Sequence, residues 1–262
     1  LIQSISQGDI NLTSSKSYFT SENTGIKLYR GKNVQRFYLD FEVEEYLKKG
    51  FKSEKIQSNS QNQFVVCQEI TGTTDKYRLH FCLTPLGDKF LFGHTANKLF
   101  LISKSDNKSI ASINNSIFMD WLFRKTSTNN HVMGYEITQF PIPKLFKSYI
   151  SILNLFYDLL SHCNRFQVSS KGVFELTLNS FVFNLYFPNH MREREIDVLQ
   201  FVERDIEKVM QGREFEKLSD TEKEQVIEQL HQTWSHPDSE VRNRIKLFAV
   251  RSPEILKPIL ES

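Results

Sequence analysis

Short apolar runs dominate the first half of the chain, and they predict β-strands rather than helices. Runs of Phe, Val, Ile, Leu and Tyr alternate with Gly, Asn, Asp and Pro, the pattern of short strands joined by turns. The runs fall at residues 26–30, 36–40, 63–70, 77–84, 89–94 and 97–103. Between them we expect a short helix at 42–49 and a polar loop at 53–63, either disordered or available for binding.

From residue 107 onward the apolar positions recur at helical spacing. The pattern predicts one helix over 107–124 that ends near Arg124, and the stretch 173–187, which also fits a strand, is expected to be mostly helical. Further amphipathic helices are predicted at 144–163, 193–210, 219–234 and 239–250. Pro141 and Pro143 stop any helix between the two patterns. The expected fold is α+β, with a β-rich domain over 1–145 that includes a few helices and a helical C-terminal region over 146–262 packing on it.

The composition is that of an ordinary globular protein. The 262 residues are 39% hydrophobic and include 22 Phe, while 10 Gly and 7 Pro are too few for a collagen-like or low-complexity chain. No apolar run approaches the roughly 18 residues that a membrane span needs, so no membrane partner is expected. The chain begins at Leu1 without a signal-like segment, which predicts a cytoplasmic fragment of a longer protein.

The cysteines and histidines predict no disulfide and no metal site. Cys67, Cys82 and Cys163 are odd in number, far apart and set in apolar runs, as buried free thiols are. Among the histidines and cysteines only His162 and Cys163 are neighbours, and no paired ligand motif is present.

The net charge of +2 conceals an asymmetry between the two halves. Residues 1–150 carry 19 Lys and Arg against 13 Asp and Glu, whereas residues 151–262 carry 14 against 18. A basic half beside an acidic half favours an anionic partner that contacts the first half alone.

Motifs of the common enzyme classes are absent from the sequence. It contains no glycine-rich phosphate loop, no Gly-x-Ser-x-Gly, no His-Glu-x-x-His and no Pro-Pro dipeptide. Instead, basic and amide side chains gather around turns at 29–36, 69–78, 93–98 and 124–131. Such segments combine donors for phosphate with groups able to read base edges, although a single one is more often an ordinary solvated loop.

The order of several short motifs resembles that of a known family. The motifs are Gln7–Asn11 (Gln-Gly-Asp-Ile-Asn), Arg30–Gln35, Gln68–Gly72, Arg78-Leu79, Gly93–Asn97, Ile113–Ser116, Ser127–His131 and Pro141-Ile-Pro143. Together they resemble the TaqI-like C-terminal specificity domain of bacterial adenine-specific DNA methyltransferases and of restriction enzymes fused to them. The similarity runs through most of residues 5–145, and 185–188 in the helical tail is similar to the continuation of that family. His94-Thr95 departs from it, because Asn or Ser is more usual in that segment.

The resemblance implies that this chain positions duplex DNA for a catalytic domain. That N-terminal methyltransferase domain of the same polypeptide would bind S-adenosylmethionine, flip an adenine out of the duplex and methylate its exocyclic nitrogen, and some members also carry a nuclease. The fragment itself is then expected to be non-catalytic and to need no cofactor. Its expected phosphate contacts are Lys32, Arg36, Lys76 and Arg124, and its candidate base readers are Arg30, Gln68, Arg78, Asn97 and Asn129. For Arg78, the alternative is a structural role, in which it forms an ion pair with Asp75 or Glu69 and stabilises the turn.

Two other function classes remain open from the sequence. The acidic helices could bind a protein partner while the loops play no part in DNA binding. DNA affinity that persists at physiological salt would favour the DNA-binding function over this one. Alternatively, His80 or His131 could act with a carboxylate in a stand-alone enzyme. Lone histidines are more often hydrogen-bonded structural residues.

Overall fold

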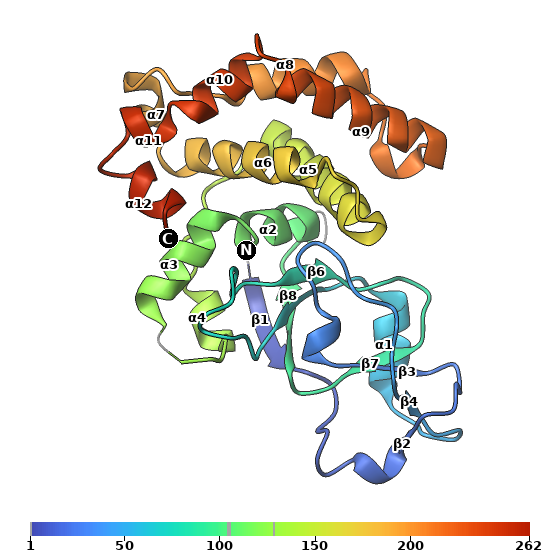
Figure 1. Cartoon of the computed structure of the whole chain (residues 1–262). Helices are drawn as coiled ribbons and strands as arrows, with labels where there is room; N and C mark the ends of the chain where they lie inside the picture. The colour runs from blue at the N-terminus through green and yellow to red at the C-terminus, as the bar shows by residue number, and fades with distance from the viewer. Residues whose placement is uncertain (1, 104–105, 128) are drawn as a thin grey trace. The chain divides into compact units, whose positions relative to one another are not determined.

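The computed structural model describes residues 2–103, 106–127 and 129–262, and the chain divides into two compact units. Unit 1 comprises Leu1–Asn115 and Arg124–Ile142, and unit 2 comprises Ser116–Phe123 and Pro143–Ser262 (Figure 1). The division at Ile142 lies close to the boundary expected after residue 145. Nothing in the sequence pattern indicates that 116–123 groups with the helical unit.

Unit 1 contains two four-stranded sheets. The first, in the order β1-β8-β5-β6, is antiparallel throughout, and the second has the order β2-β4-β3-β7 with β3 and β7 parallel. The strands of the first are β1 (Ile2–Gln7), β8 (Ala96–Leu101), β5 (Val65–Gln68) and β6 (Phe81–Leu83). Those of the second are β2 (Phe19–Thr20), β4 (Tyr46–Leu47), β3 (Lys27–Tyr29) and β7 (Phe90–Phe92).

The core of unit 1 joins the two sheets through aromatic side chains. Tyr29 of β3 contacts Phe90 and Phe92 of β7 at ring-centroid distances of 5.6 and 5.4 Å. The same buried cluster includes Val66 of β5 and Cys82 of β6. Val65, Val66 and Cys67 are all buried, so β5 reads as a continuous apolar run rather than an alternating one.

Short helices cover the sheets of unit 1. Helix α2 (Asn107–Asn114) packs on β5 and β6, α1 (Glu54–Gln61) on β7, and α4 (Gly134–Thr138) on β1. Unit 1 also contains the 3-10 turns η1 (Lys16–Tyr18) and η2 (Gly31–Asn33). Helix α3 (Ile117–Thr126) begins in unit 2 and ends in unit 1.

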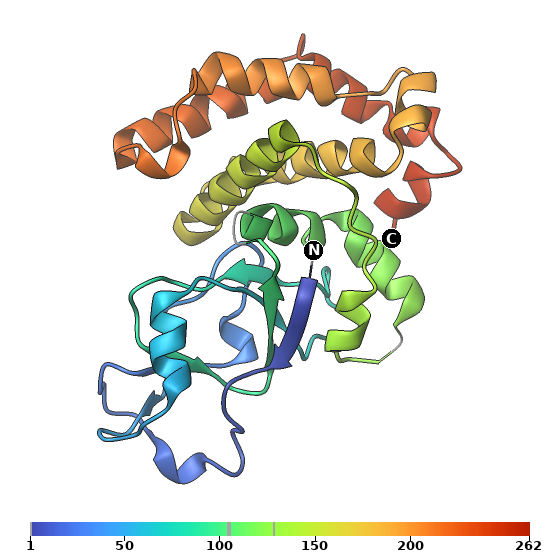
Figure 2. The same cartoon turned by 180° about the vertical axis from the view of Figure 1, so that it is seen from behind.

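Unit 2 consists of helices joined by short connections, and its longer helices are arranged in two layers. Helices α5 and α6 form one layer, and α8, α9 and α10 lie across the other, as both views show (Figures 1 and 2). The elements are α5 (Lys147–Phe166), α6 (Lys171–Tyr186), α7 (Pro188–Glu193), α8 (Leu199–Met210), η4 (Phe215–Lys217), α9 (Asp220–Ser235), α10 (Glu240–Lys246), α11 (Phe248–Arg251) and α12 (Leu256–Leu260). Trp234 of α9 joins the layers by stacking on Phe156 and contacting Phe174 edge-on.

The α+β fold class with a helical C-terminal half is confirmed. The ambiguous stretch 173–187 lies in α6, and the predicted helix 219–234 is α9, which Ser219 and Glu222 cap reciprocally. The predicted strands at 26–30, 63–70, 89–94 and 97–103 contain β3, β5, β7 and β8, whereas only the end of 77–84 forms β6. The three cysteines are buried free thiols. Within the described ranges, no helix is both long enough and apolar enough to cross a bilayer.

Three local predictions in unit 1 are wrong. Residues 36–40 form a turn rather than a strand, because Phe37 takes a left-handed φ of 71° and buries its ring completely. The expected helix at 42–49 instead contains β4, which pairs with both β2 and β3. The expected polar loop at 53–63 is helix α1, capped by Ser53.

Two predicted helices are interrupted by buried polar side chains. The helix expected over 107–124 is divided into α2 and α3, because the Asn115 amide pairs with both backbone groups of Phe81 at 2.8 and 2.9 Å. The helix expected over 193–210 begins at Leu199, since Asn184 bonds the Asp197 carboxylate and the Val198 N–H. A third predicted helix, 239–250, is divided at Leu247 into α10 and α11 without such a side chain at the break.

The left-handed end of α5 offers a small, specific test of unit 2 stability. Gln167 caps the helix with a φ of 53° and is exposed, a conformation that costs a non-glycine residue energy. Gln167→Gly should raise the free energy of unfolding by up to about 1 kcal/mol, measured by urea denaturation with Trp fluorescence. Gln229→Gly, in the middle of α9, should instead lower it by about 1 kcal/mol. Equal losses in both variants would contradict the conformational argument.

Candidate nucleic-acid interface

Segments that are far apart in the sequence meet in unit 1 around the turn between β7 and β8. Gly31 N–H donates to the Thr95 hydroxyl at 2.8 Å, and Glu69 N–H donates to the Thr95 carbonyl at 3.0 Å. We call this meeting point the loop junction; it comprises 7–11, 30–35, 68–72, 93–97 and 127–131, of which Thr128 lies outside the described residues. These are five of the segments that carry the family resemblance.

Two glycines let the backbones of the loop junction approach closely. A Cβ added to Gly8, whose φ is +57°, would lie 2.5 Å from the Gly93 carbonyl oxygen. A Cβ on Gly31 would lie 2.4 Å from the Thr95 carbonyl oxygen. Because both obstacles are backbone atoms, no side-chain rotation relieves the clash. The glycines of these motifs are therefore explained by packing.

A buried carboxylate joins three of the segments. Gln7 Nε2 lies 2.8 Å from both carboxylate oxygens of Glu69, and His131 Nδ1 lies 3.4 Å from one of them. Glu69 is only 5% exposed, and its backbone carbonyl accepts from Val132 N–H at 2.7 Å. A buried carboxylate is retained only with such partners, so Glu69 holds the ends of β1 and β5 against residues 131–132.

A second buried polar group fixes the segment after Gly8. Asp9 accepts from Lys98 Nζ at 2.8 Å, and Asn59 of α1 bonds both of these side chains at 2.9 and 2.7 Å. The side chains of Lys98 and Asp9 are 5% and 2% exposed. Burial lowers the pKa of Lys98, and the charge and hydrogen bond of Asp9 oppose that shift. We call these three residues the Asp9–Lys98–Asn59 triad.

Two arginines hold the loop 72–77 against the segment 124–131. Arg78 is 2% exposed and donates to the carbonyls of Ser127, at 3.2 Å, and Asn129. Arg124 donates in the opposite direction, to the carbonyls of Thr73 at 3.3 Å and Asp75 at 2.6 Å. A backbone bond from Thr71 N–H to the Asn130 carbonyl completes the connection.

Three of the predicted DNA contacts lie inside unit 1 and do not present a side chain to a duplex. Arg78 is the first, because its guanidinium donates to the backbone carbonyls of the 124–131 segment. Arg36 is 9% exposed, lies 3.5 Å above the Tyr77 ring and donates to the Asn115 carbonyl. Asn97 is 3% exposed and donates to the Val132 carbonyl at 2.6 Å. These three residues position the loops instead.

The two carboxylates expected to pair with Arg78 accept hydrogen bonds from other donors. Asp75 accepts from Gly72 N–H at 2.8 Å, within its own turn, and Glu69 accepts from Gln7. The bonds from Arg78 to backbone carbonyls therefore support a structural role for this residue. The sequence did not indicate that these carbonyls would be its partners.

The other predicted contacts are accessible. Arg30 and Lys32 pair with Glu45 and Glu44, the latter at 2.7 Å, and the hydrogen bond from Lys32 lowers the pKa of Glu44. Gln68 donates to the Ile70 carbonyl at 2.7 Å. Lys76 and Asn129 are exposed, and Arg124 is partly exposed. To bind DNA, Arg30 and Lys32 must exchange a carboxylate for a phosphate.

Sequence reasoning missed both the acidic partners and several exposed loop residues. The acidic run at 42–45 is visible in the sequence, but its contact with residues 30–32 is created by the turn at 31–40. The exposed polar residues Thr73, Thr74 and Asn130 belong to the two loops that the arginines hold. No local signal distinguishes them from other surface residues, because their position depends on the long-range bonds of Arg78 and Arg124.

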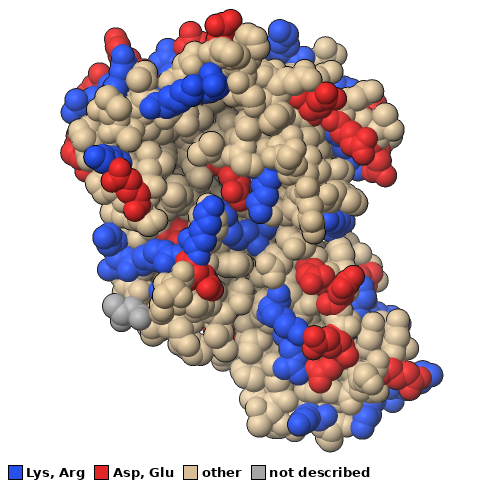
Figure 3. Space-filling model, viewed as in Figure 1, with Lys and Arg blue, Asp and Glu red and all other residues tan. Residues whose placement is uncertain are grey.

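No protein-family model matches this chain, and no curated protein matches its sequence. Unit 1 has 17 Lys and Arg against 12 Asp and Glu. Figure 3 shows these charges interspersed on the face in view rather than segregated into one basic surface. A moderate surplus of this kind supports weak electrostatic attraction to a polyanion.

The geometry gives the stand-alone enzyme little support. His131 has a carboxylate partner in Glu69, but among the described residues no Ser, Thr or Cys side chain bonds either of them. His80 Nε2 bonds the Tyr77 carbonyl at 3.1 Å. The described part of the chain also holds no group of three His, Cys, Asp or Glu side chains arranged to bind a metal ion.

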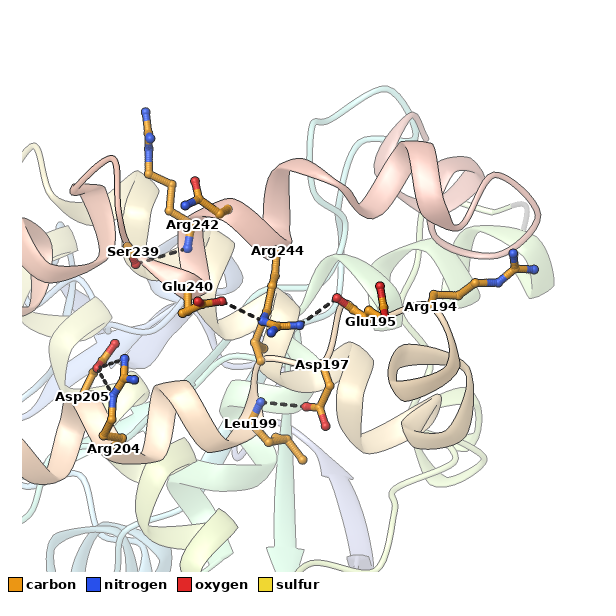
Figure 4. Close-up of polar contacts among 12 residues, drawn as sticks. Arg194, Glu195, Asp197, Leu199, Arg204, Asp205, Ser239, Glu240, Arg242 and Arg244 are labelled. Atoms are coloured by element: carbon orange, nitrogen blue, oxygen red, sulfur yellow. Dashed lines mark hydrogen bonds and ion pairs between the residues drawn. The ribbon is translucent and has the colours of Figure 1, made fainter.

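A groove of about 830 Å³ in unit 2, lined by both arginines and carboxylates, has a structural explanation. Figure 4 shows Arg244 between Glu240 and Glu195, with the guanidinium groups of Arg194 and Arg242 extending away. Arg244 donates to the Glu195 carbonyl at 2.7 Å, and Arg251 pairs with the Glu195 carboxylate at 2.9 Å. Glu195 has a left-handed φ of 55°. The arginines stabilise this turn after α7.

Proposed function

We propose that this chain is a DNA target-recognition domain that positions a duplex for an adenine-specific methyltransferase domain of the same polypeptide. The observation that carries the proposal is the loop junction, where five segments of the resemblance are bonded into one rigid support. Accessible donors and amides surround it at Lys32, Gln68, Lys76 and Asn129. Rigid positioning of such groups is what sequence reading requires, because a bidentate contact depends on a fixed orientation.

Within this proposal the accessible residues divide by chemistry. Lys32, Lys76 and Arg124 contact phosphates, and Arg30, Gln68 and Asn129 read base edges, since Arg matches guanine and an amide matches adenine. Arg36, Arg78 and Asn97 act as positioning residues. S-adenosylmethionine, adenine methylation and any nuclease activity belong to the parent polypeptide. A cytoplasmic location belongs to the same proposal and is supported by the three buried free thiols.

The test is a binding measurement that selects the recognition sequence as its first step. A random duplex library is selected on the full chain, and the enriched and scrambled duplexes are then titrated by fluorescence anisotropy over a series of salt concentrations. We expect tighter binding of the enriched duplex. Lys32→Ala and Lys76→Ala should each weaken both duplexes and flatten the log-log salt slope by about one unit.

The matched control is Lys16→Ala, which removes an exposed Lys of unit 1 outside the loop junction. It should leave both the affinity and the salt slope unchanged. An equal effect of all three substitutions would mean that net charge, not this surface, drives binding. Loss of all DNA affinity at physiological salt would favour the protein-interaction alternative.

A further inference from the structure

A pocket of about 430 Å³ in unit 2 lies between the end of α5 and one face of α9. We call it the acidic pocket. Its lining residues are His162, Phe166, Val168, Ser170, Asp220, Glu224, Ile227, Glu228 and His231. The volume is within the range of small-molecule sites. No part of the proposed DNA-recognition function uses it.

The rim of the acidic pocket carries three carboxylates on one face of α9. Asp220, Glu224 and Glu228 are spaced four residues apart, so each lies about 6 Å further along the helix. Like charges at this spacing destabilise an isolated helix. Lys223 lies 3.6 Å from Asp220, and Gln232 donates to Glu228 at 3.0 Å, whereas Glu224 has no ion pair within the described residues. The row therefore keeps an uncompensated negative charge.

The walls of the acidic pocket are apolar and partly aromatic. Phe166 is 62% exposed and lies 4.6 Å from the His162 ring, centroid to centroid. Val168 and the buried Ile227 continue this surface. Burial lowers the pKa of His162, which favours the neutral form of its ring.

Ser170 supplies a hydroxyl group to the wall of the acidic pocket. It stands at the N-cap position of α6 with helical backbone angles (φ −65°, ψ −13°), so its hydroxyl makes no capping bond. The residue is 7% exposed, lines the acidic pocket, and its hydroxyl bonds none of the residues that the structure describes. The hydroxyl is therefore available to accept a hydrogen bond from a donor group of a ligand in the pocket.

We propose that the acidic pocket binds a linear aliphatic polyamine. Ammonium groups separated by three or four methylenes match the spacing of Glu224 and Glu228 along α9, and the methylenes match the apolar walls. An ammonium at the inner end can donate to the Ser170 hydroxyl. A purely hydrophilic cation would leave Phe166 and Val168 solvated, and a neutral apolar ligand would leave the carboxylates unpaired.

The test is isothermal titration of the full chain with spermidine at about 0.15 M ionic strength, where diffuse surface attraction is screened. We expect saturable binding at one site. The double variant Glu224→Gln/Glu228→Gln should weaken it at least tenfold, and Ser170→Ala should weaken it several-fold. Thermal melts of each variant establish that the fold is retained.

Glu207→Gln is the matched control, because it removes the charge of an exposed Glu on α8 outside the pocket. It should leave spermidine affinity unchanged. The proposal is overturned by the absence of saturable binding, or by equal weakening in the control and the pocket variants. Tighter binding of tri-lysine than of spermidine would also overturn it, since the occupant would then be a peptide.

Discussion

Asp9→Asn should lower the free energy of unfolding of unit 1 by about 3–5 kcal/mol at pH 7. The substitution keeps the shape of the side chain but leaves the Lys98 ammonium buried without its counter-charge. In the wild-type chain Phe92 N–H also donates to an Asp9 carboxylate oxygen at 3.0 Å, and the substitution replaces that carboxylate with an amide. Both side chains of the pair are nearly inaccessible to water, so solvent cannot replace the lost charge.

The loss should shrink as the pH rises. Burial already lowers the pKa of Lys98, and Asp9 opposes that shift, so removing Asp9 lowers the pKa further. Between the folded and unfolded pKa values the unfolded chain binds more protons, and stability there rises with pH. Asp9→Asn should therefore recover part of its loss as the pH approaches about 10. An equal loss at every pH would contradict the buried-charge argument.

Two features of the chain make this measurement specific. Asp88→Asn removes a second Asp–Lys pair, to Lys27 at 3.5 Å, but Asp88 is 45% exposed, so its loss should stay below about 1 kcal/mol.

Cys67 and Cys82 report on unit 1 and Cys163 on unit 2, because all three thiols are buried. Thiol labelling in urea, followed by mass spectrometry, thus separates the two units. Only Cys67 and Cys82 should gain reactivity in Asp9→Asn.

Arg78→Ala should destabilise unit 1 by about 2–4 kcal/mol, mainly through unsatisfied backbone acceptors. In the wild-type chain the guanidinium donates to buried backbone carbonyls, and the substitution leaves these carbonyls without a donor. It also leaves a cavity beneath the loop. Binding of scrambled and enriched duplexes should fall together, because the loops lose their orientation rather than a base contact. A loss confined to the enriched duplex, with unchanged stability, would restore Arg78 as a base reader.

Arg124→Ala is the matched control for Arg78→Ala. Each arginine bonds two backbone carbonyls across the same pair of loops, but Arg124 is partly exposed, so water can replace it. Its stability loss should be about 0.5–1 kcal/mol. Its effect on DNA should exceed that of Lys16→Ala if it contacts a phosphate, as proposed.

The sequence predicted the helices whose apolar residues recur at helical spacing. It failed for elements that are positioned by hydrogen bonds of polar side chains. Helices α5, α6 and α9 bury apolar faces, and the helical spacing of those residues predicts them. Helix α1 is polar along most of its length and docks through Asn59, which is fully buried and bonds Asp9 and the Phe90 carbonyl. Hydrophobic periodicity cannot detect such a helix.

The candidate site shows the same limit in sharper form. Five of the motif segments do meet in the fold, yet Arg78 and Asn97, two of the expected base readers, bond backbone carbonyls. A carbonyl has no sequence signature, and the partners of Arg78 lie 49 and 51 residues away. Residue type alone therefore indicates capacity for recognition without indicating whether the side chain is turned inward.

The loop junction is held by glycines, backbone groups and buried side chains, and this has a consequence for how the surface can change. Lys32, Thr73, Thr74, Lys76 and Asn130 are exposed, and none of their side chains makes a bond that holds the junction. Replacing any one of them should alter stability by no more than about 0.5 kcal/mol. A combinatorial library at these five positions would retain its folded scaffold, so the chemistry of this exposed surface could change on an unchanged backbone.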